Sequence, residues 1–400
     1  IILPSFGLDF ERSLSLELID PSLFRMFRKR GAIPVFLQGM LGLVFDSGTG
    51  RILDEPDIAA IEGIRQIAYT FKKLKLPCAP LRVKKAFAGF IQDELDINES
   101  SVDPIDRRFF TAVSRVLWGS PFRDFNSLGL LPRHGPGSTA EKLTGNSKFS
   151  HQTWHDRLEP YFPMLHFAFP NENAYDTPEF ERVSVVSEQD ELPVKVITVP
   201  KTLKSPRIIA IEPVCMQYTQ QAVSRYLISR LESFALTTGH INFSDQSVNR
   251  ALALQSSKDK SFATLDLSAA SDRVPLSLVT DMLESCPDLL DAILACRSKK
   301  AKLPNGDILP LSKFASMGSA LCFPIESMYF YTVCVAALLR KHNLPVTYLN
   351  IKSVSRYVYV YGDDIIVPTN AAGIVVDHLQ KYLCKVNMSK SFWIGKFRES

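Results

Sequence analysis

The spacing of apolar residues changes along the chain, and three segments show the change. From Asp57 to Leu74, apolar positions recur every three or four residues, which predicts one helix. From Val194 to Ile211, apolar and polar residues alternate on both sides of a polar turn, which predicts a β-hairpin. A helical stripe returns from Gln217 to Phe234. We therefore expect helices and loops up to about residue 190, followed by a hairpin and a long helix.

The last third of the chain switches between strand and helix patterns over short distances. The expected elements, in order, are a strand at 262–267, helices at 276–284 and 288–297, a turn between short strands at 304–307, a loop at 316–319 before a long apolar helix, and a strand–turn–strand at 357–367. This order predicts an α+β fold, with helices packed on one face of an antiparallel sheet.

Composition narrows the classes of protein that fit. The chain has 400 residues, of which 46% are hydrophobic and 22% charged, so a sizeable core in two or three domains is expected and disorder is excluded. The net charge of +4 suits a nucleic-acid partner without requiring one. The apolar stretch from Met328 to Leu339 is too short to span a bilayer, so we expect a buried helix and no membrane. The 7 cysteines show no metal-binding spacing, which predicts reduced thiols.

Two adjacent carboxylates stand in the segment Tyr361-Gly362-Asp363-Asp364. Runs of β-branched and aromatic residues flank the segment and are expected to be buried strands, so the turn would fix two like charges at the margin of a sheet. Like charges held that close repel one another unless a cation compensates them. Mg²⁺ prefers oxygen ligands of this kind, so the pair predicts a metal site.

A second set of carboxylates follows the strand at 262–267. Asp266 stands at the end of that strand, and Asp272 falls near the start of the next helix, where a cap or first-turn charge is a plainer interpretation. Carboxylates from two neighbouring strand ends can hold two Mg²⁺ ions roughly 3.5–4 Å apart, the geometry for in-line displacement at phosphorus. Asp266, Asp363 and Asp364 are therefore the candidate metal ligands.

These segments occur in the order of motifs A, B and C in the palm of viral RNA polymerases. The chain resembles the replicase β subunit of single-stranded RNA bacteriophages, the levivirus type. The segments that carry the resemblance are 199–202, 209–213, 266–272, Met317-Gly318-Ser319, 361–364 and 397–400. It covers roughly residues 190–400, whereas 1–130 carry no signature.

The resemblance implies an RNA-directed RNA polymerase with a right-hand fold. Both ends of the chain look cut, so we expect a fragment with fingers and palm but with the thumb largely missing. The expected divisions are an N-terminal region with part of the fingers at 1–190, fingers with a basic nucleotide-binding hairpin at 191–261, and a palm at 262–400 that holds motifs A to D and the start of E. Expected partners are an RNA template and product, NTPs, and the host elongation factors Tu and Ts with a ribosomal protein, all in the cytoplasm of an infected bacterium.

The resemblance also implies roles for single residues. It places two Mg²⁺ ions, or Mn²⁺ in their place, on the three aspartates and the Leu267 carbonyl. Asp272 and Ser319 would read the ribose 2′-hydroxyl, and Lys390 would be a general acid for departing pyrophosphate, although a plain surface lysine is an equal interpretation. Ser319 stands where many relatives have asparagine, which offers more hydrogen bonds, so the sugar-reading network stays open. The other expected substrate-binding residues are Lys201, Lys204 and Arg207, whose charges suit a triphosphate, with Gly318 and Gly362.

Three further interpretations stay open. A reverse transcriptase shares the palm and its carboxylates, but Gly362 and Asp272 argue against it, since such enzymes exclude the 2′-hydroxyl with a bulky residue. A non-catalytic RNA-binding protein with an inherited polymerase fold would also fit. The glycines of the loop Arg133–Ser138 would let a phosphate approach the backbone, although an ordinary turn is the simpler interpretation.

Overall fold

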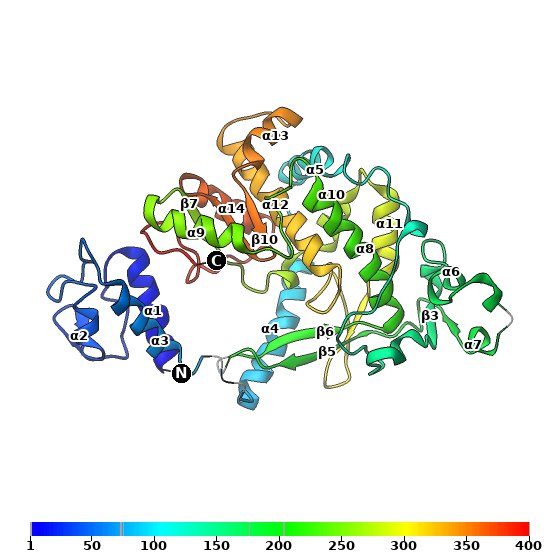
Figure 1. Ribbon diagram of the computed structural model, residues 1–400, viewed down its shortest axis with the longest axis horizontal. Helices are drawn as coiled ribbons and strands as arrows, with labels where there is room; N and C mark the ends of the chain where they lie inside the picture. The colour runs from blue at the N-terminus through cyan, green and yellow to red at the C-terminus, as the bar shows by residue number, and fades with distance from the viewer. Residues whose placement is uncertain (1, 73, 75, 176, 203–204, 400) are drawn as a thin grey trace.

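The N-terminal residues form a lobe with its own hydrophobic core. The computed structural model describes residues 2–399 except 73, 75, 176, 203 and 204. The elements of the lobe are α1 (Ile2–Leu16), β1 (Lys29–Arg30), β2 (Ile33–Pro34), α2 (Gln38–Leu41) and α3 (Ile58–Tyr69). The predicted helix is α3, and its first turn is capped because the Asp57 side chain accepts a hydrogen bond from the Ala60 backbone N–H at 3.0 Å. In Figure 1 this lobe lies at one end of the molecule.

A larger core surrounds the long apolar helix α12 (Cys322–Lys341). This is the buried helix that the apolar stretch Met328–Leu339 predicted. The length and composition of α12 would allow a membrane span, but 89% of its most apolar window is buried inside the protein, as in the core helix of a globular fold. The Trp118 indole N–H donates to the Thr332 hydroxyl at 2.9 Å within this core. The helices that pack around α12 include α5 (Pro104–Trp118), α8 (Val214–Ser233), α10 (Leu276–Leu283), α13 (Tyr348–Ser355) and α14 (Ala372–Lys381), and α11 (Pro287–Cys296) packs against α8 and α10 in the same core.

A three-stranded antiparallel sheet lies beside α12 and α14. Its strands are β7 (Phe262–Leu265), β10 (Tyr359–Tyr361) and β11 (Asp364–Pro368), in the order β10-β11-β7. Ile365 pairs with Leu265, and Tyr361 pairs with Asp364 across the hairpin turn. Helix α9 (Ser247–Asp259) contacts β7 and β10. The mixed helix-and-sheet architecture predicted from the sequence is confirmed.

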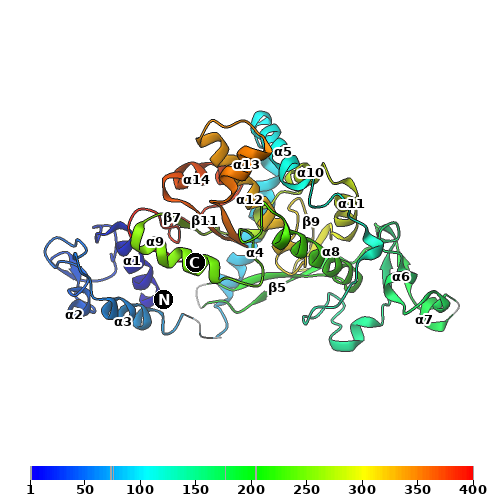
Figure 2. The same cartoon turned by 45° about the horizontal axis from the view of Figure 1, so that its top comes forward.

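A second sheet is built on the predicted hairpin. Its strands are β5 (Val194–Val199), β6 (Arg207–Ile211), β8 (Lys300–Lys302) and β9 (Ile308–Pro310), in the order β6-β5-β8-β9. The β5–β8 pair is parallel, which no local pattern predicted. Helix α4 (Pro80–Glu99) packs against β6, and Figures 1 and 2 show it running from the hairpin towards the middle of the molecule.

The remaining elements are short. They are α6 (Met164–Ala168), α7 (Pro178–Glu181), the parallel pair β3 (Thr153–His155) and β4 (Ser184–Val186), and the 3₁₀ turns η1 (Ser127–Gly129), η2 (Gly145–Phe149), η3 (Asp156–Leu158), η4 (Glu172–Ala174), η5 (Ser271–Arg273) and η6 (Thr369–Ala371). In Figure 2, α6 and α7 lie at the end opposite the N-terminal lobe. All seven cysteines are free, and six of them are buried, so the prediction of reduced thiols is confirmed. The expected domain divisions stay a prediction.

Candidate active site

The carboxylate pair lies on the turn between β10 and β11. Gly362 has a φ of 61°, and a Cβ at this position would lie 2.3 Å from the Phe323 ring. Only glycine takes that backbone conformation without strain and leaves room for the ring. Asp363 is exposed at the turn, whereas Asp364 is half-buried and accepts a hydrogen bond from the Gln246 side chain at 3.2 Å. The turn therefore points the two carboxylates into different surroundings.

Asp266 follows β7 directly, so strand pairing brings it to the same margin of the sheet as the carboxylate pair. Its backbone N–H donates to the Ser391 hydroxyl at 3.1 Å, and the Asn387 side-chain amide donates to its carboxylate at 2.8 Å. The Lys390 ammonium lies 3.6 Å from the other carboxylate oxygen. The segment 387–391 thus holds Asp266 from one side.

Burial and mutual repulsion disfavour the charged forms of these acids. Burial raises the pKa of Asp364 to about 6, and the charges of Asp363 and Asp266 add to the rise. Burial also raises the pKa of Asp266, where Lys390 and Asn387 act in the opposite direction and Asp363 adds to the rise. A cation placed among the three carboxylates would relieve this repulsion.

The three aspartates fit Mg²⁺ in donor chemistry and in charge, because all their donors are hard oxygens in a site short of positive charge. Among the residues that the structure describes, however, no three His, Cys, Asp or Glu side chains are grouped closely enough to hold a metal ion as they stand. Asp266 contacts Lys390 and Asn387, and Asp364 contacts Gln246. The carboxylates would have to exchange these partners for the ion. The metal ligands, including the Leu267 carbonyl, stay a prediction.

The predicted basic residues come near the carboxylates from the β5–β6 hairpin. Partial burial lowers the pKa of Lys201, as do the charges of Arg207 and Lys390, whereas Asp363 and Asp266 raise it. Lys201 thus feels the charges of both the basic residues and the acids around the site. Arg207 begins β6, and Lys204 lies outside the residues that the structure describes.

Asp272 lies in η5, and its carboxylate is held by residues that precede the glycine loop. The Ser316 hydroxyl donates to Asp272 Oδ1 at 2.8 Å, and the Lys313 ammonium lies 3.0 Å from the same oxygen. Asp272 is a first-turn residue of the short η5, as the plainer interpretation allowed, but its side chain does not cap the next regular helix, α10, which begins only at Leu276. The acid is thus fixed on one side by a cation and a hydroxyl.

The glycine loop is fastened to the second sheet. Gly318 has a φ of 133°, and a Cβ there would lie 2.0 Å from the Ala210 carbonyl oxygen. The Ala210 N–H donates to the Met317 carbonyl at 2.9 Å, which joins the loop to β6. Any side chain at Gly318 would therefore push the loop and β6 apart.

Ser319 is held by a residue on α8. Its hydroxyl donates to Gln220 Oε1 at 3.0 Å, and the Ala320 N–H donates to the same oxygen at 3.1 Å. The Gln220 amide in turn donates to the Cys296 carbonyl at 2.8 Å, and its side chain is fully buried. The ribose-reading candidates Asp272 and Ser319 thus lie on one braced loop system.

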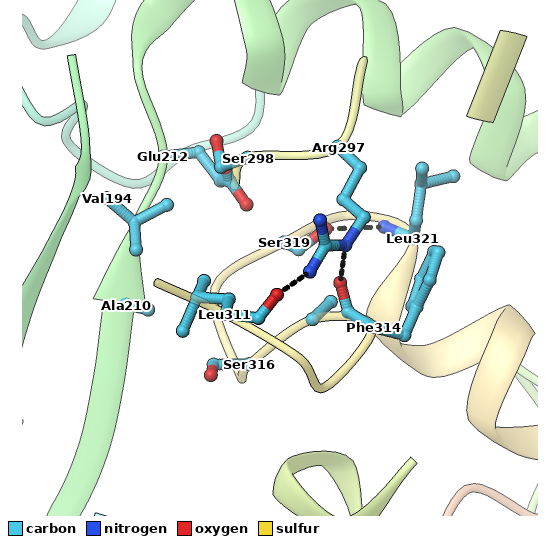
Figure 3. Close-up of a pocket in the computed structure, with 11 residues that line it drawn as sticks. Val194, Ala210, Glu212, Arg297, Ser298, Leu311, Phe314, Ser316, Ser319 and Leu321 are labelled. Atoms are coloured by element: carbon cyan, nitrogen blue, oxygen red, sulfur yellow. Dashed lines mark hydrogen bonds between the residues drawn. The ribbon is translucent and has the colours of Figure 1, made fainter. Parts of the chain in front are cut away.

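Behind this loop lies a cavity of about 10 Å³ (Figure 3). Arg297 crosses it and donates to the Phe314 carbonyl at 2.7 Å and the Leu311 carbonyl at 2.6 Å. Burial raises the pKa of Glu212 to about 7, and its carboxylate accepts a hydrogen bond from Ser298. These buried polar groups are mutually satisfied, as the low polarity of the interior requires.

Several residues around the site were not predicted from the sequence. Asn387 and Ser391 lie close to Lys390 in the sequence, but no role was predicted for them. Gln220 stands between Thr219 and Gln221 on α8, so no local signal in the sequence singled it out. The loop Arg133–Ser138 forms no helix or strand, and Lys148 donates to its carbonyls at Gly135 and, at 2.7 Å, Gly137. Its expected phosphate role stays a prediction.

Comparisons with known proteins agree with the motif order. The RNA-directed RNA polymerase subunit beta of Qbeta virus (strain MX1) is 35% identical over 206 residues, which are 52% of this chain and 32% of that protein. The beta chain of Enterobacteria phage fr is 36% identical over 205 residues, 51% of this chain and 34% of that protein. The matched part thus spans about a third of the length of these curated relatives.

A solved structure and a family model complete the comparison. The RNA-dependent RNA polymerase of a human picorbirnavirus superposes with a TM-score of 0.47 and 13% identity, over 81% of this chain and 61% of its own. The family model described as RNA replicase, beta-chain, matches residues 177–400, which include both larger sheets and every candidate site residue. This match covers more than half of the chain, and the chain therefore belongs to the RNA replicase beta-chain family.

Proposed function

We propose that this chain is the catalytic part of an RNA-directed RNA polymerase. The reaction is nucleotidyl transfer: the 3′-hydroxyl of a growing RNA attacks the α-phosphorus of a templated NTP, and pyrophosphate leaves. The observation that carries the proposal is the convergence of Asp266, Asp363 and Asp364 at one sheet margin, where burial and repulsion raise the pKa of Asp266 and Asp364. Family membership with named polymerases supports the same reaction.

Two Mg²⁺ ions, for which Mn²⁺ can substitute, are the proposed cofactors. Asp266, Asp363 and Asp364 would hold them, with the Leu267 carbonyl as a further ligand. When bound, the ions lower the pKa of the attacking hydroxyl and stabilise the leaving pyrophosphate. Asn387 and Lys390 each face one oxygen of Asp266, and these are the contacts that an ion would replace.

The chain's own cations and hydroxyls handle the rest of the substrate. Lys201 and Arg207, with Lys204 by the resemblance, neutralise the triphosphate. Asp272 and Ser319 hydrogen-bond the ribose. Gly318 and Gly362 serve substrate binding by shaping the two turns that carry Ser319 and the carboxylate pair. Lys390 carries a proton on Nζ within the site and would donate it to the departing pyrophosphate, which balances the proton lost by the 3′-hydroxyl.

The right-hand assignment follows from the same residues. The β5–β6 hairpin and its sheet correspond to fingers, and the β10-β11-β7 sheet with α12 and α14 corresponds to the palm. The proposed setting is the cytoplasm of an infected bacterium with a viral RNA as template. The resemblance supports host elongation factors Tu and Ts and a ribosomal protein as partners, and the phage relatives support the bacterial host.

Primer extension tests the proposal. The assay combines a short RNA primer–template with Mg²⁺ and NTPs, supplies bacterial host factors in a second series, and compares wild type with Asp363→Asn. We expect templated rNTP incorporation by the wild type and at least a thousandfold slower incorporation by the variant, because about 4 kcal/mol of transition-state stabilisation is lost. An active Asp363→Asn protein would refute the metal assignment.

A non-catalytic RNA-binding protein is the second candidate function. The pairing of Asp266 with Lys390 favours it, because that ion pair would satisfy the acid without any metal. RNA binding that persists without Mg²⁺, together with no synthesis in either series, would establish this alternative. Incorporation of dNTPs in preference to rNTPs would point to a reverse transcriptase instead.

A further inference from the structure

Lys313 is a fully buried cation next to the ribose-reading candidate. None of its side chain is exposed, yet it lies just before the glycine loop on a segment with no regular secondary structure. A buried ammonium is costly unless carboxylates and an aromatic face surround it. Lys313 has both kinds of partner, since its ammonium lies 3.4 Å from the centroid of the Phe90 ring.

The two carboxylates beside Lys313 come from distant parts of the chain. Asp272 Oδ1 lies 3.0 Å from the ammonium, and Glu94 Oε2 lies 3.4 Å from it. Glu94 is itself buried, and its other oxygen accepts hydrogen bonds from the backbone N–H groups of Ser312 and, at 3.1 Å, Lys313. Helix α4 therefore fixes both the backbone and the charge of Lys313.

Helix α4 also holds the residue that follows Asp272. The guanidinium of Arg273 lies 2.7 Å from Asp96 and 3.5 Å from Asp93. Helix α4 therefore anchors both the cation that contacts Asp272 and the residue that follows Asp272 in the chain. This helix lies within residues 1–130, where the sequence offered no functional signature.

The contacts to Asp272 are made to one oxygen only. Among the described residues, both polar partners of its carboxylate, Lys313 and Ser316, contact Oδ1. Oδ2 is therefore the oxygen left to accept a hydrogen bond from a ligand. A carboxylate fixed in this way discriminates strongly, because a sugar without its hydroxyl leaves the acceptor unpaired.

We propose that Lys313, held by Glu94, is the positioning residue that aims Asp272 at the ribose 2′-hydroxyl. This inference rests on the proposed polymerase function and extends it to α4. Without the ammonium, Asp272 loses its fixed orientation and its compensating charge. The efficiency of incorporation then decreases for the nucleotide that carries the 2′-hydroxyl and not for its deoxy analogue.

The test compares rNTP and 2′-dNTP incorporation by wild type and Lys313→Met. Methionine keeps the length of the side chain and removes the charge. We expect kcat/KM for the rNTP to fall about tenfold or more with kcat/KM for the dNTP nearly unchanged, so the sugar preference shrinks by the same factor. An equal loss for both substrates would assign Lys313 to the fold alone and overturn the inference.

Two further variants separate positioning from stability. Glu94→Gln keeps the shape of α4 and removes only the remote charge, so it should lower the same preference by a smaller factor. Lys148→Met removes another buried ammonium, one that contacts carbonyls of the 133–138 loop and not Asp272, and it should lower the thermal midpoint without changing the preference. If Lys148→Met lowered the preference for rNTP over dNTP as much as Lys313→Met does, the inference would be overturned.

Calorimetric titration with ATP and 2′-dATP distinguishes this inference from the proposed function. In one outcome, the wild type makes no RNA but binds ATP more tightly than 2′-dATP, and Lys313→Met abolishes this preference. That outcome would refute polymerisation and keep the positioning role. A wild type that makes RNA while Lys313→Met keeps full preference in binding and synthesis would refute the positioning role alone. A wild type that neither makes RNA nor prefers ATP to 2′-dATP would refute the polymerase function and the positioning role together.

Discussion

The two sides of the candidate site are built in opposite ways. The side proposed to bind the ribose, called the ribose side, carries Asp272 and Ser319, and both have fixed partners. Lys313 and Ser316 contact Asp272, and Gln220 contacts Ser319. On the carboxylate side, three acids repel one another, and burial raises the pKa of Asp266 and Asp364. The proposed ribose side is held in place by the protein itself, whereas the carboxylate side carries negative charge that its protein partners only partly compensate.

This difference has a physical reason. Discrimination between sugars depends on an acceptor that does not move, so its supports must belong to the protein. A metal site gains its affinity from charge that nothing else neutralises, so its strain must remain until the ion arrives. The ribose side should therefore respond to mutation with or without Mg²⁺, and the carboxylate side should respond mainly when Mg²⁺ is present.

The largest expected effects belong to the carboxylate side, where Asp266→Asn complements Asp363→Asn. We expect about a thousandfold slower incorporation, equivalent to about 4 kcal/mol, because one metal ligand is lost. Without Mg²⁺, the free energy of unfolding should stay unchanged or rise, since a neutral amide removes the cost of burying a charge and the repulsion from Asp363, which together outweigh the lost contact with Lys390. Thermal melts with and without Mg²⁺ check this: wild type should be stabilised by the ion and the variant should not.

Asp124→Asn is the matched control for that experiment. Asp124 forms a surface ion pair with Arg230, away from the carboxylates, and such pairs contribute little. Its Mg²⁺-dependent shift should equal that of the wild type. Equal shifts in the Asp266 variant as well would break the comparison, because the carboxylate side would then not be the ion site.

The next effect concerns pH and the buried acid Glu212 behind the ribose side. Burial raises its pKa to about 7, so the folded chain keeps a proton that the unfolded chain releases near pH 4.5. Stability should therefore fall as pH rises from about 4.5 to 7, by roughly 3 kcal/mol from this residue. Glu212→Gln should lack that fall and be more stable than wild type at pH 8, as urea unfolding at several pH values would show.

Glu188→Gln is the control, since a hydrogen bond from Lys299 and the charge of that lysine lower the pKa of this exposed acid. The Glu188 variant should follow the wild-type pH curve above pH 5. Parallel curves for wild type and Glu212→Gln would show that Glu212 is not protonated in the folded state. The buried polar groups behind Ser319 would then include a charged Glu212 carboxylate instead of a protonated one.

A smaller effect is expected for Gly318→Ala, which loosens the braced side directly. The added Cβ would meet the Ala210 carbonyl, and a φ of 133° disfavours any side chain, so we expect a loss of about 2 kcal/mol in the free energy of unfolding. Gly137→Ala is the control, because a Cβ there meets nothing within 4 Å. The loss should be the same with and without Mg²⁺, and a loss that Mg²⁺ abolishes would contradict the comparison.

The sequence predicted the carboxylate side better than the ribose side, for a physical reason. Asp363 and Asp364 can be recognised in the sequence because two adjacent acids lie between two strand patterns. Local strand patterns likewise predicted β5, β6, β10 and β11. The supports Lys313 and Gln220 act across 219 and 99 positions, to Glu94 and Ser319 respectively, and no local pattern encodes such pairing. The parallel β5–β8 contact and the separate core of the N-terminal lobe escaped prediction for the same reason.

The smallest expected effect, and the sharpest test of the braced side, is Gln220→Leu. Leucine fills a similar volume but leaves the Ser319 hydroxyl, the Ala320 N–H and the Cys296 carbonyl without their partner, which costs roughly 1–3 kcal/mol for an unsatisfied buried group. Part of that cost falls on stability, so we expect the rNTP preference to fall only a fewfold, measured by competitive incorporation. Gln221→Leu changes the same side chain one position along α8, where it does not face Ser319, and should leave the preference intact. If both variants lower the preference equally, the helix as a whole supports the loop, and the specific hold of Gln220 on Ser319 is refuted. If only Gln220→Leu does, the ribose side is braced from two directions, by α4 through Lys313 and by α8 through Gln220.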